Sequence, residues 1–432
     1  MAKTEDTLKR TAAHTRDWTQ GSIIGNLWGL SWPIIISGSL TMLGPTIDMI
    51  WVGKLGASAI AGVGIAGMIV MVVNSLTTGL FTGLRAMVAR FIGAGDHEGA
   101  NHVAQQALVV SLLFSIVMAA IGVFLTRPIL LLFGVAPDVV TEGAAYMRIQ
   151  FIGSVTMALR LMTEATMQAS GDAMAPMKIA LFFRLFHIAL TPFMVFGWWI
   201  FPRLGVSGAA LTGIISQGLG GFIGLWFLCK GWTRLRLSLR HFQPDPGLIW
   251  RLVRVGLPAS ITGMERTFAN LALMWFVVPF GTTAVAAHSL IQRIDSFVHL
   301  PVQGFGQGAG VLAGQNLGAK QPERAARTTW LAAGLVTGVM VIASVLIWFW
   351  VEYVVRLFNT EPSLVQTASI FMRIEIVSYL VFGLVLVLSQ SLNGVGDTIV
   401  PMLATLTTMW LIQVPLSFFL SRYTGLGVYG VR

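Results

Sequence analysis

Two acidic residues lie inside long apolar stretches, where an ionised carboxylate is costly. Asp48 is part of the segment Thr46–Gly56, TIDMIWVGKLG, and Glu265 follows Pro258 by seven residues. Keeping a charge in hydrocarbon costs at least about 2.5–3.5 kcal/mol, so a membrane segment that retains one commonly uses it for ions or protons. Burial also moves the protonation of a carboxyl group toward neutral pH. We therefore interpret Asp48 and Glu265 as candidates for binding a cation or a proton.

Each acid also has a purely structural interpretation. Asp48 lies shortly before Lys54, so it could reach the headgroup level and contact water there. Glu265 could form an ion pair with the adjacent Arg266 or with Arg293 and so hold two helices together. Structural ion pairs and functional acids both place carboxylates in unusual surroundings, and the sequence leaves both interpretations open.

Other polar residues accompany these acids. Asn74 lies midway along an apolar stretch, where it suits either a neutral partner for Asp48 or a hydrogen bond between helices. His288, Arg293 and Asp295 form a polar stripe that we expect to face a central cavity. A lone histidine in such a stripe is more commonly a hydrogen-bonded packing residue. We therefore leave the role of His288 open.

The composition excludes the soluble globular classes. Of the 432 residues, 55% are hydrophobic and 11% are charged, whereas ordinary soluble domains carry about 25% charged residues. The single cysteine, Cys229, excludes an internal disulfide, and no histidine stands at a metal-ligand spacing from it. We find no HExxH or GxSxG motif. The sequence therefore predicts an all-α polytopic membrane protein with no catalytic residue, no bound metal and no cofactor beyond a coupling ion.

The length of the apolar stretches predicts eleven membrane-spanning helices. A span needs about twenty mainly apolar residues. By this measure the predicted helices cover residues 27–52, 63–87, 103–126, 144–169, 174–200, 206–229, 255–280, 284–312, 329–351, 366–391 and 398–421. Lys and Arg are concentrated in the N-terminal tail and in alternate loops. By the positive-inside rule the N-terminus faces the cytoplasm, and we expect the protein in the inner (plasma) membrane.

The two halves of the chain repeat each other at an offset of 225 residues. The offset carries Pro33 to Pro258, Gly79 to Gly304 and Arg148 to Arg373, among other pairs. Halves with an even number of spans share one orientation, so we expect a pseudo-twofold axis along the membrane normal and a substrate path between two six-helix bundles.

This repeat sets the predicted domain limits: a cytoplasmic tail over residues 1–26, a first lobe over 27–229, a cytoplasmic linker over 230–254 and a second lobe over 255–432. The linker is rich in Arg, and we expect it to contact anionic lipid headgroups rather than nucleic acid. The segment LGVYGVR at the end repeats the start of the sixth span, LGVSGAA. The sequence therefore holds eleven of twelve expected helices and the start of the twelfth.

Four motifs carry a resemblance to a known family. TIDMIWVGKLG, FIGAGDHEGA, FGTTAVAAHSL and AGQNLGAKQPERA resemble the multidrug and toxic compound extrusion (MATE) transporters, of the superfamily that also exports oligosaccharidyl-lipids and polysaccharides. The resemblance implies an antiporter that exports organic cations and other amphipathic compounds in exchange for H⁺ or Na⁺. It also implies that Asp48 is a protonation site and that Glu265 helps to bind the coupling cation.

The chain also departs from the family pattern. Thr191 precedes Pro192 where one branch has an acid, and the place of a tenth-span acid falls near Phe382. The coupling ion therefore stays open, although a Na⁺ site needs several oxygen ligands and the scarcity of acids favours H⁺. The alternative function is a flippase for a lipid-linked saccharide or another amphipathic metabolite. We expect a monomer whose partners are small amphipathic molecules and membrane lipids.

Overall fold

The computed structural model describes residues 17–431 apart from 133, 135, 241 and 359–360. Residues 1–16 of the predicted tail lie outside this part of the chain. The regular elements of the described residues are all helical. The first lobe contains α2 (Ile23–Val52), η1 (Gly53–Leu55), α3 (Ala57–Gly93), α4 (His97–Phe124), α5 (Thr126–Leu131), α6 (Pro137–Ile152), α7 (Ser154–Ala169), α8 (Met174–Phe196) and α9 (Val206–Lys230).

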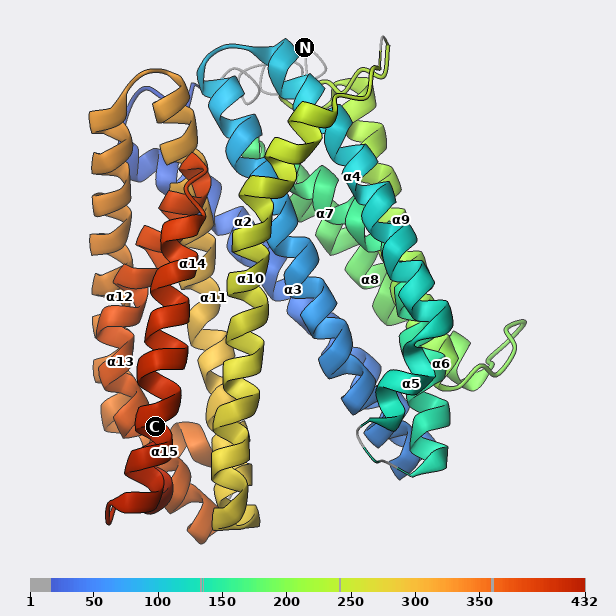
Figure 1. Cartoon of the computed structure of the whole chain (residues 1–432), viewed down its shortest axis with the longest axis vertical. Coiled ribbons are helices and arrows are strands. Elements are labelled where there is room, and N and C mark those ends of the chain that lie inside the picture. Colours follow the sequence, from blue (N-terminus) through green and yellow to red (C-terminus); the bar gives the residue numbers. More distant parts are fainter. Residues whose placement is uncertain (1–16, 133, 135, 241, 359–360, 432) are drawn as a thin grey trace, which may run out of the picture.

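The second lobe has the same order of long helices. It contains α10 (Pro246–Val277), η2 (Val278–Phe280), α11 (Thr282–Gly318), α12 (Pro322–Arg356), α13 (Pro362–Val395), α14 (Ile399–Leu406), the π-helix η3 (Thr407–Gln413), α15 (Val414–Tyr423) and η4 (Gly427–Val431). In Figure 1 the two sets of helices form two bundles that are joined at the top of the view and diverge below. This arrangement confirms the predicted all-α membrane fold.

Eight helical segments of the described chain are long and apolar enough to cross a membrane. They are α2 with η1, α3, α4, α8, α9, α12, α13 and the combined segment Ile399–Tyr423. The other predicted spans fall on α10, on α11 and on the pair α6 and α7. Charged residues such as Glu265 and Asp295 lower the mean hydropathy of α10 and α11, although both helices exceed the length that a span requires.

One predicted helix is wrong in its continuity. The stretch 144–169 is not a single helix, because α6 ends at Ile152 and α7 begins at Ser154. Between them, Gly153 leaves the helical region, with φ −80° and ψ 4°. The side chain of Ile214 from α9 fills the space that a Cβ at Gly153 would occupy. The break therefore lies at a residue that packs closely on a distant helix, a contact that the apolar pattern does not contain.

A second difference concerns the start of α10. The helix begins at Pro246, inside the stretch predicted to be linker. The Asp245 side chain accepts a hydrogen bond of 3.0 Å from the backbone N–H of Leu248 and caps the helix. Pro246 occupies the first helical position, where its missing N–H has no intrahelical partner to lose.

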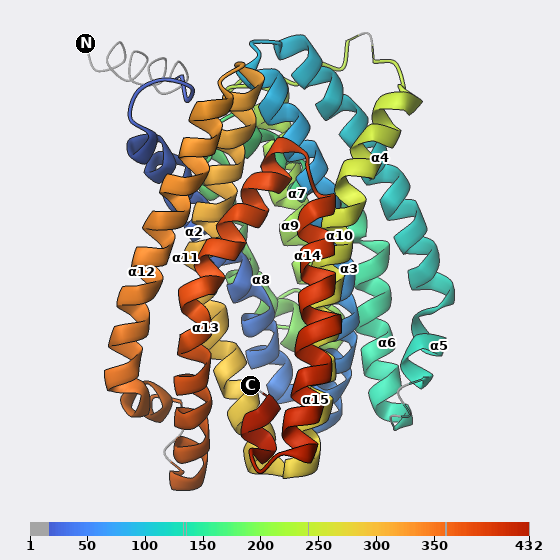
Figure 2. The same ribbon diagram turned by 60° about the vertical axis from the view of Figure 1, so that its left-hand side comes forward.

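The 225-residue repeat appears again in the contacts between the lobes. Glycines let two helix backbones approach closely, as in membrane helix pairs generally. Three contacts of glycines in α3 have a counterpart in α11, in which both residues are shifted by 225 positions. The pairs of contacts are Gly79–Ser260 with Gly304–Ile35, Gly83–Gly256 with Gly308–Ser31, and Gly93–Gln315 with Gly318–Arg90. In each lobe the second helix therefore packs on the first helix of the other lobe, as α3 does on α10 (Figure 1) and α11 on α2 (Figure 2).

The lobes meet at the end of the molecule where α3 and α11 end, and they diverge toward the other end (Figure 1). At the junction, the side-chain amide of Gln315 donates a hydrogen bond of 2.7 Å to the carbonyl of Ala169, the last residue of α7. The described structure is therefore closed at this end.

Residues from three parts of the chain hold the N-terminal segment over this junction. The indole of Trp18 is buried, and the guanidinium of Arg234 in the linker lies 5.6 Å from its ring. The side chain of Asn26 donates to the Trp18 carbonyl at 3.1 Å, and Arg324 of the second lobe donates to the Gly21 carbonyl at 2.8 Å. The segment thus connects both lobes on the closed side.

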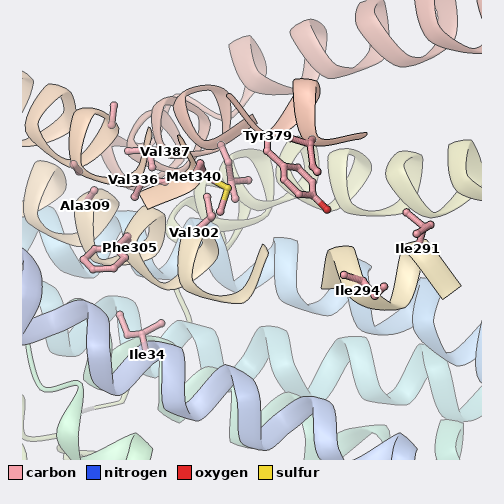
Figure 3. Close-up of a cluster of buried hydrophobic side chains, with 14 of the residues drawn as sticks. Ile34, Ile291, Ile294, Val302, Phe305, Ala309, Val336, Met340, Tyr379 and Val387 are labelled. Atoms are coloured by element: carbon pink, nitrogen blue, oxygen red, sulfur yellow. The ribbon is translucent and has the colours of Figure 1, made fainter. Parts of the chain in front are cut away.

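The largest apolar core lies in the second lobe, where α11, α12 and α13 pack together. Figure 3 shows Phe305 of α11 and Met340 of α12 in this cluster, with Ile34 of α2 beside them. Because α2 belongs to the first lobe, this core also joins the two lobes. It fixes the position of α11, which carries His288 and Asp295, relative to α2, which carries Asp48.

Candidate functional site

Asp48 lies inside the first lobe. Only 6% of the residue is exposed, which disfavours the interpretation that its carboxylate merely reaches water at the headgroup level. The nearest polar partner is His187 of α8, whose Nε2 atom is 3.2 Å from Asp48 Oδ1. The N–H of the ring is not aligned well enough for a hydrogen bond. The structure therefore places an imidazole against the carboxylate at contact distance.

Arg184 lies one turn before His187 on α8 and is also buried. Its Nη1 atom is 3.1 Å from Nδ1 of His187, and its Nη2 donates a hydrogen bond of 3.2 Å to the carbonyl of Thr41. The guanidinium group thus joins the imidazole on α8 to the backbone of α2. Arg184, His187 and Asp48 form a continuous polar group between the two helices, which we call the first-lobe triad.

The local sequence of α2 explains why the guanidinium fits there. Pro45 has no N–H, so the carbonyl of Thr41, four residues earlier, lacks its usual helical donor. Arg184 supplies a donor to that carbonyl. Gly44 has no side chain, and a Cβ at this position would lie 2.9 Å from Cζ of Arg184. The Gly-Pro pair therefore provides both the space and the hydrogen-bond acceptor for the arginine.

Glu265 is a buried acid of the second lobe, as Asp295 is. It lies on α10, and 4% of the residue is exposed. Neither carboxylate oxygen has a hydrogen-bond partner among the described residues. Within the same part of the chain no ion pair within 4.0 Å joins Glu265 to Arg266 or Arg293, so the structural ion pair is not formed in this conformation. An ionised carboxylate is costly in such surroundings.

The stripe predicted on α11 divides between two faces. His288 and Asp295 are buried, and the hydroxyl of Tyr379 on α13 donates a hydrogen bond to Asp295. Figure 3 shows Tyr379 pointing toward the part of α11 that carries Ile291 and Ile294. Arg293 is exposed. The structure therefore brings His288 and Asp295 into the second lobe and leaves Arg293 on its surface.

One other predicted residue, Asn74, and an ion pair on α7 can be placed. Asn74 is half-buried on α3, and no hydrogen bond joins it to Asp48 in the described structure. Arg160 and Glu164, four residues apart on α7, form the ion pair that their spacing suggests, with 2.7 Å between Nη1 and Oε2. The carboxylate of Glu164 is thus neutralised within its own helix.

Sequence reasoning missed Arg184 and His187. Both interrupt the apolar run of the fifth predicted span, and a spacing of three places them on one helix face. This signal was available, but it did not indicate which helix the face would contact. The pairing with Asp48 requires the packing of α8 against α2, two helices separated by more than one hundred residues.

The described residues offer no ready metal centre. No group of three or more His, Cys, Asp or Glu side chains in this part of the chain is arranged to hold a metal ion. The atom in contact with Asp48 Oδ1 is a nitrogen, Nε2 of His187, whereas hard cations in proteins are bound by several oxygen atoms.

Comparison with known proteins identifies relatives over nearly the whole length. The chain is 28% identical over 407 residues to the "Probable multidrug resistance protein YoeA" of Bacillus subtilis (strain 168), covering 92% of this chain and 87% of that protein. It is 22% identical over 401 residues to a protein of Shewanella oneidensis named "FAD transporter", covering 90% and 86% respectively.

Solved structures and family profiles agree with this similarity. A structure described as "Crystal structure of MATE in the bent conformation" superposes with a TM-score of 0.90 at 23% identity, covering 96% of this chain and 91% of that one. The profile of the MatE family matches residues 33–193 and 258–419, one segment in each lobe. With its duplicated helical lobes and its motifs, the chain therefore belongs to the MatE family, the multidrug and toxic compound extrusion transporters.

Proposed function

We propose that this protein is a secondary antiporter that exports amphipathic organic cations in exchange for protons. The observation that carries the proposal is that each lobe contains a buried acid, Asp48 or Glu265, that is not within ion-pair distance of an arginine or lysine among the described residues. Buried acids of this kind are the usual sites of proton transfer in membrane proteins. A relative named as a multidrug resistance protein supports the choice of cargo.

The two acids couple cargo to protons by competition. An ionised carboxylate attracts a cationic cargo, and a protonated one does not. A proton that enters from outside and binds Asp48, Glu265 or both therefore favours release of the cargo outward. Loss of the proton toward the cytoplasm restores the charged acid for the next cargo molecule. Exchange of one proton for one monovalent cation moves no net charge, so each unit of pH gradient supports about a tenfold accumulation.

The coupling ion follows from the atoms around the acids. A Na⁺ site would need several oxygen ligands, and the side chain facing Asp48 presents a nitrogen. Both carboxylate oxygens of Glu265 are without a hydrogen-bond partner in the described structure, and protonation would remove the cost of that buried charge. These features favour H⁺ over Na⁺.

The basic loops give the orientation of the transporter. By the positive-inside rule the basic N-terminal tail, the linker and the loop after α11 face the cytoplasm. The junction of α3 with α11 then lies on the cytoplasmic side, and the diverging ends of the lobes face outward (Figure 1). We accordingly assign the described conformation as outward-facing, with the protein in the plasma membrane and acting as a monomer.

A second candidate cargo is an amphipathic anion. One relative is named an FAD transporter, and Arg184 is buried in the first lobe with no carboxylate within ion-pair distance in the described structure. Its positive charge suits a phosphate-bearing metabolite better than an organic cation. Under this alternative FAD, and not a cationic dye, would be the transported compound.

Transport by purified protein in liposomes tests the proposal. Ethidium and FAD are compared as cargo under an imposed pH gradient or an imposed Na⁺ gradient, with wild type, Asp48→Asn and Glu265→Gln. We expect ethidium transport that the pH gradient drives and that at least one of the substitutions abolishes. Transport driven only by Na⁺ would contradict the proton assignment. Intact proton-driven transport in both variants would remove the role of the acids.

A further inference from the structure

We propose that Arg184 and His187 are positioning residues that make the Asp48 carboxyl group, and not the histidine, the proton acceptor of the first lobe. The inference rests on the proposed function, since it specifies how one of the two acids in that exchange is prepared for its proton. It assigns a role to Arg184 and His187, which are not themselves the proposed proton-binding acids.

The hydrogen-bond chemistry of the triad fixes the state of the imidazole. A guanidinium group can only donate hydrogen bonds. Since Nη1 of Arg184 is 3.1 Å from Nδ1 of His187, the Nδ1 atom must accept and carries no proton. The ring proton is then on Nε2, the atom that is 3.2 Å from the carboxylate of Asp48. His187 is therefore a neutral ring that presents an N–H to the acid.

The same contact opposes protonation of the histidine. A second ring proton would have to sit on Nδ1 and point at the guanidinium, placing two donors and two positive charges against each other. Both side chains are buried, so water cannot screen that repulsion. The carboxylate of Asp48 has a position open to a proton, because Nε2–H is poorly aligned with it. A proton that reaches the triad therefore binds the carboxyl group.

The charges around Asp48 determine how tightly it holds that proton. The cation of Arg184 lies on the far side of the His187 ring from the carboxylate, and an opposite charge nearby favours the ionised form of a carboxyl group. Arg160 on α7 is also buried, but its charge is paired with Glu164. An opposite charge nearby shifts the protonation of a carboxyl group by about 1–3 pH units. Removal of the Arg184 charge should therefore move the pH at which protons and cationic cargo compete to a higher value.

The guanidinium also fixes the geometry of the site. It fills the space beside Gly44 and satisfies the Thr41 carbonyl that Pro45 leaves without a helical donor. The position of the charge relative to Asp48 is thus set by the backbone of the helix that carries the acid. A lysine at position 184 would keep the charge but could not form the planar fork that reaches both His187 and Thr41.

The first test measures ethidium affinity of the purified protein as a function of pH. Protons compete with the dye, so affinity rises with pH around a midpoint. We expect Arg184→Gln to move this midpoint to higher pH by about one unit and Arg184→Lys to move it less. Lys178→Gln is the matched control, since it removes one positive charge from an exposed position on the same helix, and it should leave the midpoint unchanged.

The variants separate this inference from the function on which it rests. Asp48→Asn should remove the first-lobe component of the pH dependence; if it does not, the assignment of Asp48 as a proton site fails. If Asp48→Asn removes that component but Arg184→Gln leaves the midpoint unchanged, the positioning role of Arg184 is refuted. His187→Gln retains an acceptor for Arg184 and a donor for Asp48, so pH dependence should persist. Its loss would make His187 the proton carrier and overturn the inference.

A second measurement needs no cargo. Nitrogen-15 NMR of histidine-labelled protein distinguishes the two neutral tautomers from the charged ring, and the spectrum of His187→Gln identifies the signal of His187. We expect the Nε2–H tautomer at every pH between 5 and 8. Protonation of His187 within this range, or the opposite tautomer, would contradict the proposed arrangement.

Discussion

The interlobe contact at Gly83 gives a prediction whose sign can be worked out from the structure. A Cβ at this position would lie 2.8 Å from the backbone nitrogen of Gly256 and 2.8 Å from the backbone oxygen of Leu252. Backbone atoms cannot rotate away, so Gly83→Ala forces α3 and α10 apart. Overpacking of this kind costs about 1–3 kcal/mol. The helix propensity of alanine offsets roughly 1 kcal/mol of that cost.

Gly64→Ala is the matched control on the same helix. No atom lies within 4 Å of a Cβ built at Gly64, so this variant gains the helix propensity and meets no clash. The propensity terms cancel in the comparison, which leaves a difference in stability of about 1–3 kcal/mol between the two variants. Gly308→Ala occupies the position equivalent to Gly83 but meets the Ser31 hydroxyl at 2.5 Å. Because a hydroxyl can rotate, its effect should be smaller.

Thermal unfolding of the purified variants in detergent provides the assay. Gly83→Ala should melt below wild type, Gly64→Ala at or above it, and Gly308→Ala between the other two. If Gly83→Ala and Gly64→Ala melt at the same temperature, the close approach of α3 and α10 does not exist in the folded protein, and the argument from the repeated glycine contacts is refuted.

Three further perturbations have defined outcomes. Tyr379→Phe removes the donor to the buried Asp295 and should lower stability by about 1–3 kcal/mol, whereas Tyr353→Phe, at a position 69% exposed, should not change the melting temperature. The backbone N–H of Leu248 holds the pKa of Asp245 below its ordinary value, so ionised Asp245 stabilises the fold above the unfolded-state pKa of about 3.9. Asp245→Ala should therefore lower the melting temperature at pH 7. The effect should become progressively smaller as the pH falls below about 4. Trp18→Ala removes the ring that packs over the closed junction, and spin labels at positions 98 and 323 in a Cys229→Ser background should show a broader distance distribution than in wild type; an unchanged distribution would show that the segment does not hold the lobes together.

Much of the fold could be predicted because the two halves of the sequence repeat each other. The 225-residue offset that links Gly79 to Gly304 in the sequence also relates the contacts of these glycines with Ser260 and Ile35. Apolar stretches of sufficient length then locate the helices. The break at Gly153 could not be predicted in this way, because a glycine within an apolar stretch does not by itself end a helix, and its close contact with Ile214 of α9 appears only in the folded chain.

The candidate site could be predicted only in part for a similar reason. An acid in an apolar stretch is conspicuous, and both Asp48 and Glu265 are buried in the structure. The partner of Asp48 was not evident, because Arg184 and His187 belong to a different helix whose face toward α2 is set by tertiary packing. Gly44 and Pro45 were visible in the sequence. That they provide the space and the hydrogen-bond acceptor for the Arg184 guanidinium is evident only from the contact between α8 and α2.

The most direct test of the proposed exchange measures protons released when cargo binds. Ethidium is added to the purified transporter in weakly buffered detergent solution near neutral pH, and a pH-sensitive dye reports the released protons. We predict proton release in proportion to bound ethidium for wild type, and none for the double variant Asp48→Asn, Glu265→Gln. Ethidium binding without proton release by wild type, or equal release by the double variant, would contradict the account.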